Sequence, residues 1–153
     1  MNAKLFWFEE DITEFNGEFA FLSNFYPCEI EYEGITYPTV EHAYQAAKSL
    51  DKEVHKKIAK LKYPGQAKKA GRHLHIRSDW EDVKVKIMEY LLMKKFAGYH
   101  ELSEKLYDTG ERYLEEGNNW GDTFWGVCSG KGRNMLGLLL MSVREKIKPL
   151  YDK

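Results

Sequence analysis

The chain has 153 residues, of which 43% are hydrophobic and 14% aromatic, and its formal net charge is −1. This size and composition predict a single globular domain over residues 1–153 and exclude a disordered chain. The near-zero charge excludes a global basic field that would attract nucleic acid, so a polyanionic partner would have to be met by a local site.

Cysteine usage and hydropathy favour a soluble, cytoplasmic protein without membrane contact. Cys28 and Cys128 match no zinc or CxxC spacing. A disulfide between them stays open, but a reduced chain is the simpler interpretation. The N-terminus does not resemble a signal peptide, and the longest apolar run, residues 135–143, is too short to span a bilayer. The histidines show no metal-ligand spacing, so we expect neither a metal nor a cofactor.

The first forty residues predict a small N-terminal sheet. Residues 4–8 are apolar and aromatic, which favours a first strand. Residues 15–27 show neither the periodicity of a helix nor that of a strand, and they indicate an ordered aromatic loop. In this loop, Asn24 either presents its amide to a ligand or closes an Asx-turn on its own backbone. Residues 29–38 alternate around a Glu-Gly turn, and this predicts a β-hairpin.

A helix with a mixed polar face follows the hairpin. Thr39 is a good N-cap for a helix that runs to Lys48. Glu41, Tyr44, Gln45 and Lys48 fall at i, i+3, i+4 and i+7, which places them on one face beside small alanines. This face is either a wet surface or the floor of a pocket.

The rest of the chain is predicted to be mostly helical, with helices at residues 51–61, 66–72, 79–96, 100–107 and 135–147. Ser78 is expected to cap the longest of them. Residues 112–116 suggest a short strand, and residues 117–134 are loop-like, with two Trp and five Gly. The predicted fold class is therefore α+β, mostly α-helical, with a small N-terminal β-sheet or hairpin.

Two stretches combine reactive polar groups with aromatic side chains, namely the Glu41/Lys48 helix face and residues 120–134. Aromatic rings can stack on a flat heterocycle, while a carboxylate orients sugar hydroxyls or a water, or stabilises an oxocarbenium-like centre. Lys131 and Arg133 lie among glycines before a helix, where a phosphate would be favoured.

Each of these residues also has a simpler interpretation. Glu41 is favoured in a first helical turn by the macrodipole alone, and from the residues themselves this is the stronger alternative. Lys48 reads as a surface lysine, Trp80 as a packing residue and Asp122 as a turn residue. The glycines around Lys131 lack the P-loop spacing, which argues against a nucleoside triphosphate site.

Several motifs, in chain order, resemble the YbiA-like, or NADAR, family. They are Ser23-Asn24-Phe25-Tyr26, the segment from Tyr37 to Lys48, Trp125-Gly126, and the segment from Gly132 to Gly137 followed by Leu140, Met141 and Arg144. The resemblance extends from about Phe19 to Glu145. The Glu-His-Tyr-Gln-Lys helix signature is the more specific part, and the closing Asn-x-Leu-Gly helix is a second, independent match.

The resemblance implies an N-glycosidase that cleaves a ribose C1–N bond. Its substrate would be a small phosphorylated ribosyl intermediate of the riboflavin pathway, or ADP-ribose carried on guanine in DNA or RNA. A module that binds ADP-ribose or a nucleotide without cleaving it, and an inert structural domain, are the alternatives. The sequence does not indicate an oligomeric state.

The resemblance also implies roles for individual residues. In catalysis, Glu41 would position the ribose hydroxyls or the attacking water, and Lys48 would act at C1 as a charge or through a Schiff base. Some members carry an acid directly after Trp-Gly, where this chain has Val127, so Asp122 is the nearest carboxylate for a third catalytic role. The implied substrate-binding residues are Asn24, Phe25, Tyr44, Gln45, Trp80, Trp125, Gly126, Arg133 and Asn134.

Overall fold

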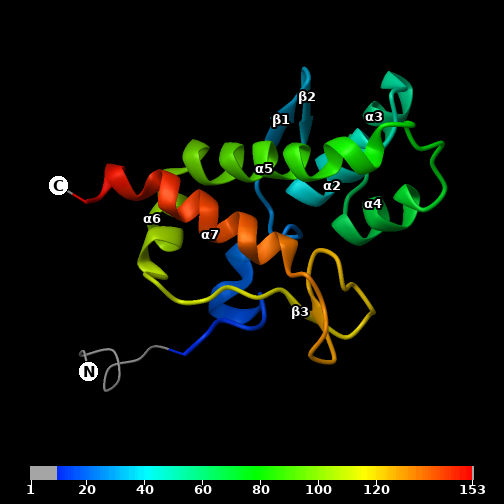
Figure 1. The fold of residues 1–153 in the computed structure, drawn as a ribbon. Coiled ribbons are helices and arrows are strands. Elements are labelled where there is room, and N and C mark those ends of the chain that lie inside the picture. The colour runs from blue at the N-terminus through cyan, green and yellow to red at the C-terminus, as the bar shows by residue number, and fades with distance from the viewer. Residues whose placement is uncertain (1–9, 153) are drawn as a thin grey trace, which may run out of the picture. The chain divides into compact units, whose positions relative to one another are not determined.

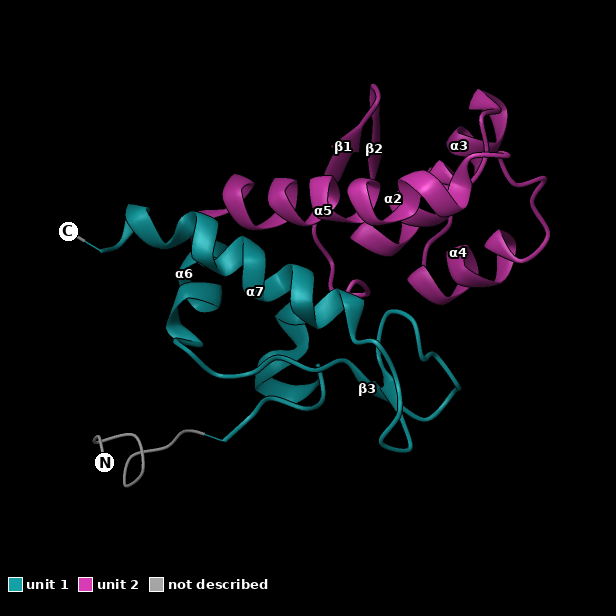
Figure 2. Ribbon diagram, viewed as in Figure 1, with its two compact units in different colours: residues 1–23, 101–153 teal, residues 24–100 magenta. Residues whose placement is uncertain are grey.

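The computed structural model describes residues 10–152 (Figure 1). The chain divides into two compact units, which Figure 2 distinguishes by colour. Unit 1 comprises residues 1–23 and 101–153, and unit 2 comprises residues 24–100. The strand predicted at residues 4–8 lies outside the described residues.

Unit 2 contains a hairpin followed by helices: β1 (Ile30–Tyr32), β2 (Ile35–Tyr37), α2 (Val40–Ala47), α3 (Lys52–Ala59), α4 (Pro64–Gly71) and α5 (Trp80–Gly98). The strands pair antiparallel, with Ile30 opposite Tyr37. Glu33 and Gly34 both have positive φ, at 49° and 84°, as a tight hairpin turn requires. The predicted hairpin is confirmed.

Helix α2 is the central element of unit 2, because it packs against α3, α4 and α5 (Figure 1). All of its residues are buried, including the polar ones. Val40, Ala43 and Ala46 are completely inaccessible, and the small alanine side chains allow the neighbouring helices to approach closely. The polar face of α2 is therefore not a wet surface, and that alternative is wrong.

The helix starts in unit 2 show which caps the sequence predicts correctly. Thr39 caps α2 as predicted, since its Oγ1 accepts a 3.1 Å hydrogen bond from the backbone N–H of His42. The predicted Ser78 cap of α5 is wrong, because Asp79 occupies the N-cap position and makes no side-chain cap bond there. The Asp79 carboxylate instead accepts hydrogen bonds of 2.6 and 3.0 Å from Arg77.

Unit 1 contains the elements η1 (Gly17–Leu22), α6 (His100–Asp108), β3 (Gly117–Asn118), β4 (Val127–Cys128), α7 (Met135–Ile147) and η2 (Lys148–Leu150). The helix predicted at residues 135–147 is confirmed. The predicted aromatic loop contains the 3₁₀-helix η1, whose Phe21 and Leu22 are buried. A helix of this kind repeats every three residues, so the 3.6-residue pattern did not reveal it.

The sheet elements of unit 1 differ from the prediction. In residues 112–116 the structure has only a bridge, in which Leu114 pairs with Ile12, so the strand predicted there is wrong. The strands lie instead at β3 and β4, which pair parallel over two residues each. Strands of this length are too short to show an alternating pattern.

The whole described chain is mostly helical with two small two-stranded sheets, and this confirms the predicted fold class. Cys28 and Cys128 are both free thiols. Within residues 10–152, no helix has the combination of length and apolar composition that crossing a bilayer requires.

Candidate active site

Glu41 is held in place on the polar face of α2. It is 7% exposed and Gln45 is 5% exposed. Nε2 of Gln45 donates a 2.7 Å hydrogen bond to Oε2 of Glu41, across the i, i+4 spacing of the helix. The backbone N–H of Glu41 donates to the carbonyl of Asn24 at 3.0 Å. A buried carboxylate needs such partners, and they fix its orientation.

Lys48 follows α2 at its C-cap and lies over aromatic rings. Its Nζ is 5.8 Å from the centroid of the Tyr44 ring, and that ring lies 5.1 Å from the ring of Trp80. Tyr44 and Trp80 are both buried. The carbonyl of Lys48 accepts a 2.8 Å hydrogen bond from the backbone N–H of Arg77. Lys48 is thus anchored at its backbone and at its ammonium group, where the ring quadrupole attracts a cation.

The surroundings of Lys48 favour its neutral form. Burial is the largest cause and lowers the pKa of Lys48 below that of an exposed lysine. Glu41 opposes this shift, whereas the positive charges of Lys84, Arg72 and Lys68 lower the pKa further. A lysine with a depressed pKa is a better nucleophile near neutral pH, because more of it carries a free electron pair.

Asn24 and Phe25 lie just before the hairpin of unit 2. The Asn24 Nδ2 group donates to Sδ of Met88 on α5 at 3.5 Å. Among the described residues, its Oδ1 has no hydrogen-bond partner, so it does not accept the backbone N–H bond that an Asx-turn requires. Phe25 is 41% exposed, which is high for a large apolar side chain.

Asp122 organises a turn in unit 1. Its Oδ1 accepts hydrogen bonds from the backbone N–H groups of Phe124 (3.1 Å) and Trp125 (2.9 Å). This is the turn role that the sequence offered as the simpler alternative. The turn sets the rings of Phe124 and Trp125 edge to face at 4.9 Å, and the guanidinium of Arg133 lies 5.0 Å from the Phe124 ring.

Gly126 and Asn134 fix the backbone of the same loop. A Cβ at residue 126 would lie 1.9 Å from a carboxylate oxygen of Glu116, so only glycine fits there. Asn134 is buried, with Oδ1 accepting from the backbone N–H of Glu116 at 3.0 Å and Nδ2 donating to the carbonyl of Leu114 at 2.8 Å. Both residues thus act on the loop conformation.

The predicted site residues fall into two groups, one in each unit. Unit 2 brings together Asn24, Glu41, Tyr44, Gln45, Lys48 and Trp80 by the contacts above, and it also contains Phe25. Unit 1 brings together Asp122, Trp125, Gly126, Arg133 and Asn134. The sequence reasoning missed the cations near Lys48. The i, i+4 spacing of Lys68 and Arg72 was a signal, but lysines on a helix are most simply a solvated face.

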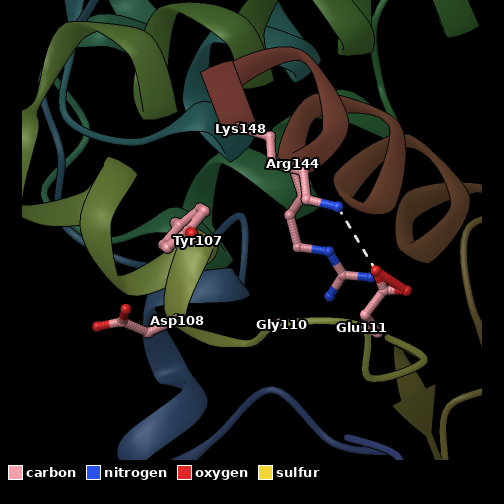
Figure 3. Close-up of a pocket in the computed structure, with 6 residues that line it drawn as sticks. All are labelled: Tyr107, Asp108, Gly110, Glu111, Arg144 and Lys148. Atoms are coloured by element: carbon pink, nitrogen blue, oxygen red, sulfur yellow. Dashed lines mark hydrogen bonds and ion pairs between the residues drawn. The ribbon is translucent and has the colours of Figure 1, made fainter. Parts of the chain in front are cut away.

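Unit 1 also contains a separate pocket of about 260 Å³ (Figure 3). It is lined by Tyr107, Asp108, Gly110, Glu111, Arg144 and Lys148. Nζ of Lys148 lies 3.5 Å from Oε1 of Glu111, and Nη1 of Arg144 donates to Oγ1 of Thr109 at 2.9 Å. The two acids balance the two cations, so this pocket has no evident preference for an anion, and none of its lining residues is a predicted site residue.

Known proteins resemble this chain over most of its length. The profile of the NADAR domain matches residues 5–148. The N-glycosidase Npun_R5314 of Nostoc punctiforme is 40% identical over 136 residues, which are 85% of this chain and 86% of that protein. The N-glycosidase YbiA of Escherichia coli is 37% identical over 133 residues, which are 85% of this chain and 82% of that protein.

A longer relative and a solved structure complete the comparison. The riboflavin biosynthesis protein VVA0006 of Vibrio vulnificus is 36% identical over 97% of this chain, and the chain spans only 40% of that protein's length. The NMR structure of the E. coli protein YbiA matches with a TM-score of 0.81 at 34% identity, over 95% of this chain and 91% of the other.

Proposed function

The chain belongs to the NADAR family, and on this premise we propose that it is an N-glycosidase acting on a phosphorylated ribosyl heterocycle. The reaction is hydrolysis of the bond between ribose C1 and a nitrogen of the heterocycle. The observation that carries this proposal is the buried Glu41 carboxylate, fixed by Gln45 on the same helix face as a lysine of depressed pKa.

Glu41 serves as the acceptor that orients the reacting oxygen. The Gln45 amide fixes this carboxylate, and a carboxylate oxygen is the kind of acceptor that a ribose hydroxyl or a water requires. In direct hydrolysis, the water oxygen bonds to C1 as the C1–N bond breaks. One water proton passes by way of an acceptor to the leaving nitrogen, so the heterocycle leaves as its neutral amine and the hydroxyl stays on C1. The fixed carboxylate lowers the entropic cost of placing the water.

Lys48 acts at C1 in one of two ways. As an ammonium group it stabilises electron density that shifts toward the leaving nitrogen. As a neutral amine it attacks C1 of the ring-opened sugar, displaces the heterocyclic amine and forms a Schiff base, which water then hydrolyses to return the sugar aldehyde and the free lysine. Its depressed pKa supports the second route.

The substrate contacts are proposed from the two residue groups. In unit 2, Tyr44, Trp80 and Phe25 offer aromatic surface to the heterocycle, and Asn24 offers an amide. In unit 1, the proposed contacts are Trp125, Gly126, Arg133 and Asn134, with Asp122 as a third acid, and these assignments rest on the family resemblance.

The names of two relatives favour a substrate from the riboflavin pathway. The Vibrio relative and a Zea mays relative, which is 34% identical over 84% of this chain, are both named riboflavin biosynthesis proteins. We therefore propose a ribosylaminopyrimidine phosphate as the substrate. ADP-ribose on guanine in nucleic acid is the second candidate, because a single flipped or single-stranded base needs only a small site.

A two-substrate assay tests the proposal. The purified protein is given phosphoribosylaminouracil and, separately, a guanine-ADP-ribosylated oligonucleotide, and released base and sugar are followed by mass spectrometry. Release from the uracil compound, absent in Lys48→Ala, is the expected result. Release from the oligonucleotide alone would assign the second substrate, and binding of either compound without release would replace the enzyme by a binding module.

A further inference from the structure

Two cations lie beside the buried face of α4, which consists of Ala67 and Gly71. Lys68 and the C-cap residue Arg72 are spaced i, i+4, so they lie on one side of the helix. Gly71 is spaced i, i+3 from Lys68, and its Cα packs directly on the Gln45 side chain, which holds Glu41. Lys68 and Arg72 therefore lie at the edge of the contact between α4 and α2 that positions the Glu41 carboxylate.

A third cation approaches from α5. Lys84 lies one turn after Trp80, whose ring packs on Tyr44 beneath the Lys48 ammonium. The Lys84 side chain is only 14% exposed, and its Nζ bonds to Oε1 of Glu81 at 2.7 Å. The Lys84 side chain is thus largely shielded from solvent, one helical turn from Trp80, and is not a freely solvated surface charge.

Three cations act electrostatically on a fourth. The positive charges of Lys68, Arg72 and Lys84 all lower the pKa of Lys48, and Glu41 acts on it in the opposite direction. Bringing like charges together costs free energy in the unliganded protein, unless an anion shares their field. A cluster of four cations, next to a fixed carboxylate and aromatic rings, is the electrostatic counterpart of a phosphorylated sugar.

We infer that Lys68, Arg72 and Lys84 bind the phosphate group of the ribosyl substrate whose C1 is reached by Lys48, an inference that rests on the proposed function. A phosphate dianion accepts several charge-assisted hydrogen bonds, and a guanidinium such as that of Arg72 can engage two of its oxygens at once. The cluster thereby selects phosphorylated over unphosphorylated ribosyl compounds. It also brings an anion close to Lys48, so that substrate binding relieves the repulsion.

The test compares one substrate with and without its phosphate. Values of kcat and KM are measured for phosphoribosylaminouracil and for its dephosphorylated form, with wild type and the variants Lys68→Gln, Arg72→Gln and Lys84→Gln. Each variant is expected to raise KM for the phosphorylated compound about 10-fold, the usual effect of one charged hydrogen bond. The dephosphorylated compound should keep its KM. At a pH above the rising limb that Lys48 sets, where losing a neighbouring charge no longer changes its neutral fraction, kcat should stay nearly constant for both compounds.

Matched variants and a binding measurement separate the possible failures. Lys69→Gln removes an exposed lysine from the far side of α4 and should leave every constant unchanged. Equal losses on both compounds, or no loss, would overturn the inference, as would a phosphate-dependent loss in Arg133→Gln but not in Arg72→Gln. If wild type hydrolyses neither compound, the proposed function fails. Calorimetry that compares the affinity for ribose 5-phosphate with the affinity for ribose then still tests the phosphate site. Unchanged affinity of Arg72→Gln for ribose 5-phosphate would overturn the phosphate site by itself.

Discussion

Gly71 on α4 approaches Gln45 on α2 so closely that a Cβ at residue 71 would lie 1.8 Å from the Gln45 amide oxygen. The same amide donates its 2.7 Å hydrogen bond to Glu41. The orientation of the proposed catalytic carboxylate therefore depends on a helix-to-helix contact in which a side chain at residue 71 would displace the Gln45 amide. Activity should depend on residue 71, although this residue has no reactive group.

The first prediction concerns Gly71→Ala. The added methyl group must displace Gln45, so we expect kcat to fall about 10-fold and the free energy of unfolding to fall by about 1–3 kcal/mol, as overpacking typically causes. Turnover and urea denaturation measure the two effects. Gly65→Ala, on the same helix with no atom within 4 Å of the new Cβ, is the control: turnover should be unchanged, and the free energy of unfolding should not fall, since alanine favours a helix over glycine. Normal turnover in Gly71→Ala would show that Gln45 does not position Glu41.

The second prediction distinguishes the two roles of Lys48. Glu41→Gln and Lys48→Ala should each reduce turnover by at least about 100-fold with the fold intact, since each removes a group that acts on the reacting atoms. Lys48→Arg keeps the charge but cannot form a Schiff base. Its turnover should be as low as that of Lys48→Ala, and borohydride should trap a covalent sugar adduct in wild type only. Substantial activity in Lys48→Arg would assign Lys48 the purely electrostatic role.

The third prediction is a pH dependence of the same step. Only the neutral amine attacks C1, so turnover should rise with pH through the pKa of Lys48, which burial and the neighbouring cations lower from 10.5. Lys68→Gln removes one of those charges, which raises this pKa and moves the rising limb of the pH profile to higher pH. A limb that does not move in Lys68→Gln would mean that the titrating group is not Lys48.

The fourth prediction concerns Lys95, which is fully buried in α5. Its Nζ lies 5.0 Å from the centroid of the Phe96 ring and 5.5 Å from that of Tyr26, and burial lowers the pKa of Lys95 to about 7. Between pH 7 and the ordinary value of 10.5, the unfolded chain binds a proton that the folded chain does not. This lysine therefore makes stability increase with pH across that window.

Lys95→Met removes that dependence. From pH 7 to pH 10, the free energy of unfolding of wild type relative to Lys95→Met should increase by about 3 kcal/mol, measured by urea denaturation. Lys86→Met, which changes an exposed lysine on the same helix, should follow wild type. Parallel curves for wild type and Lys95→Met would contradict a depressed pKa at Lys95.

The elements that the sequence predicts well are those defined by local chemistry. Thr39 caps α2 because its hydroxyl meets a backbone N–H three residues later, and the hairpin turn at Glu33-Gly34 needs only its own backbone geometry. The predicted Ser78 cap is wrong for a local reason as well. Ser78 and Asp79 are adjacent polar residues, and Asp79 occupies the N-cap position.

The sequence indicated candidate site residues but not the contacts between them. The i, i+4 spacing placed Glu41 and Gln45 on one face, but their burial depends on helices that pack from later in the chain. The role of Gly71 and the charges near Lys48 arise from the same helix packing, which a periodic sequence pattern does not predict. For Asp122 the sequence offered both a catalytic and a turn role, and the structure shows the turn bonds to Phe124 and Trp125.

The most direct test of the central claim is release of the aminouracil base from phosphoribosylaminouracil, followed by mass spectrometry for wild type, Glu41→Gln and Lys48→Ala in parallel. The account predicts stoichiometric release of base and ribose phosphate by wild type, and at least about 100-fold slower release by both variants. Release by either variant at the wild-type rate would contradict the assignment of catalysis to this face of α2.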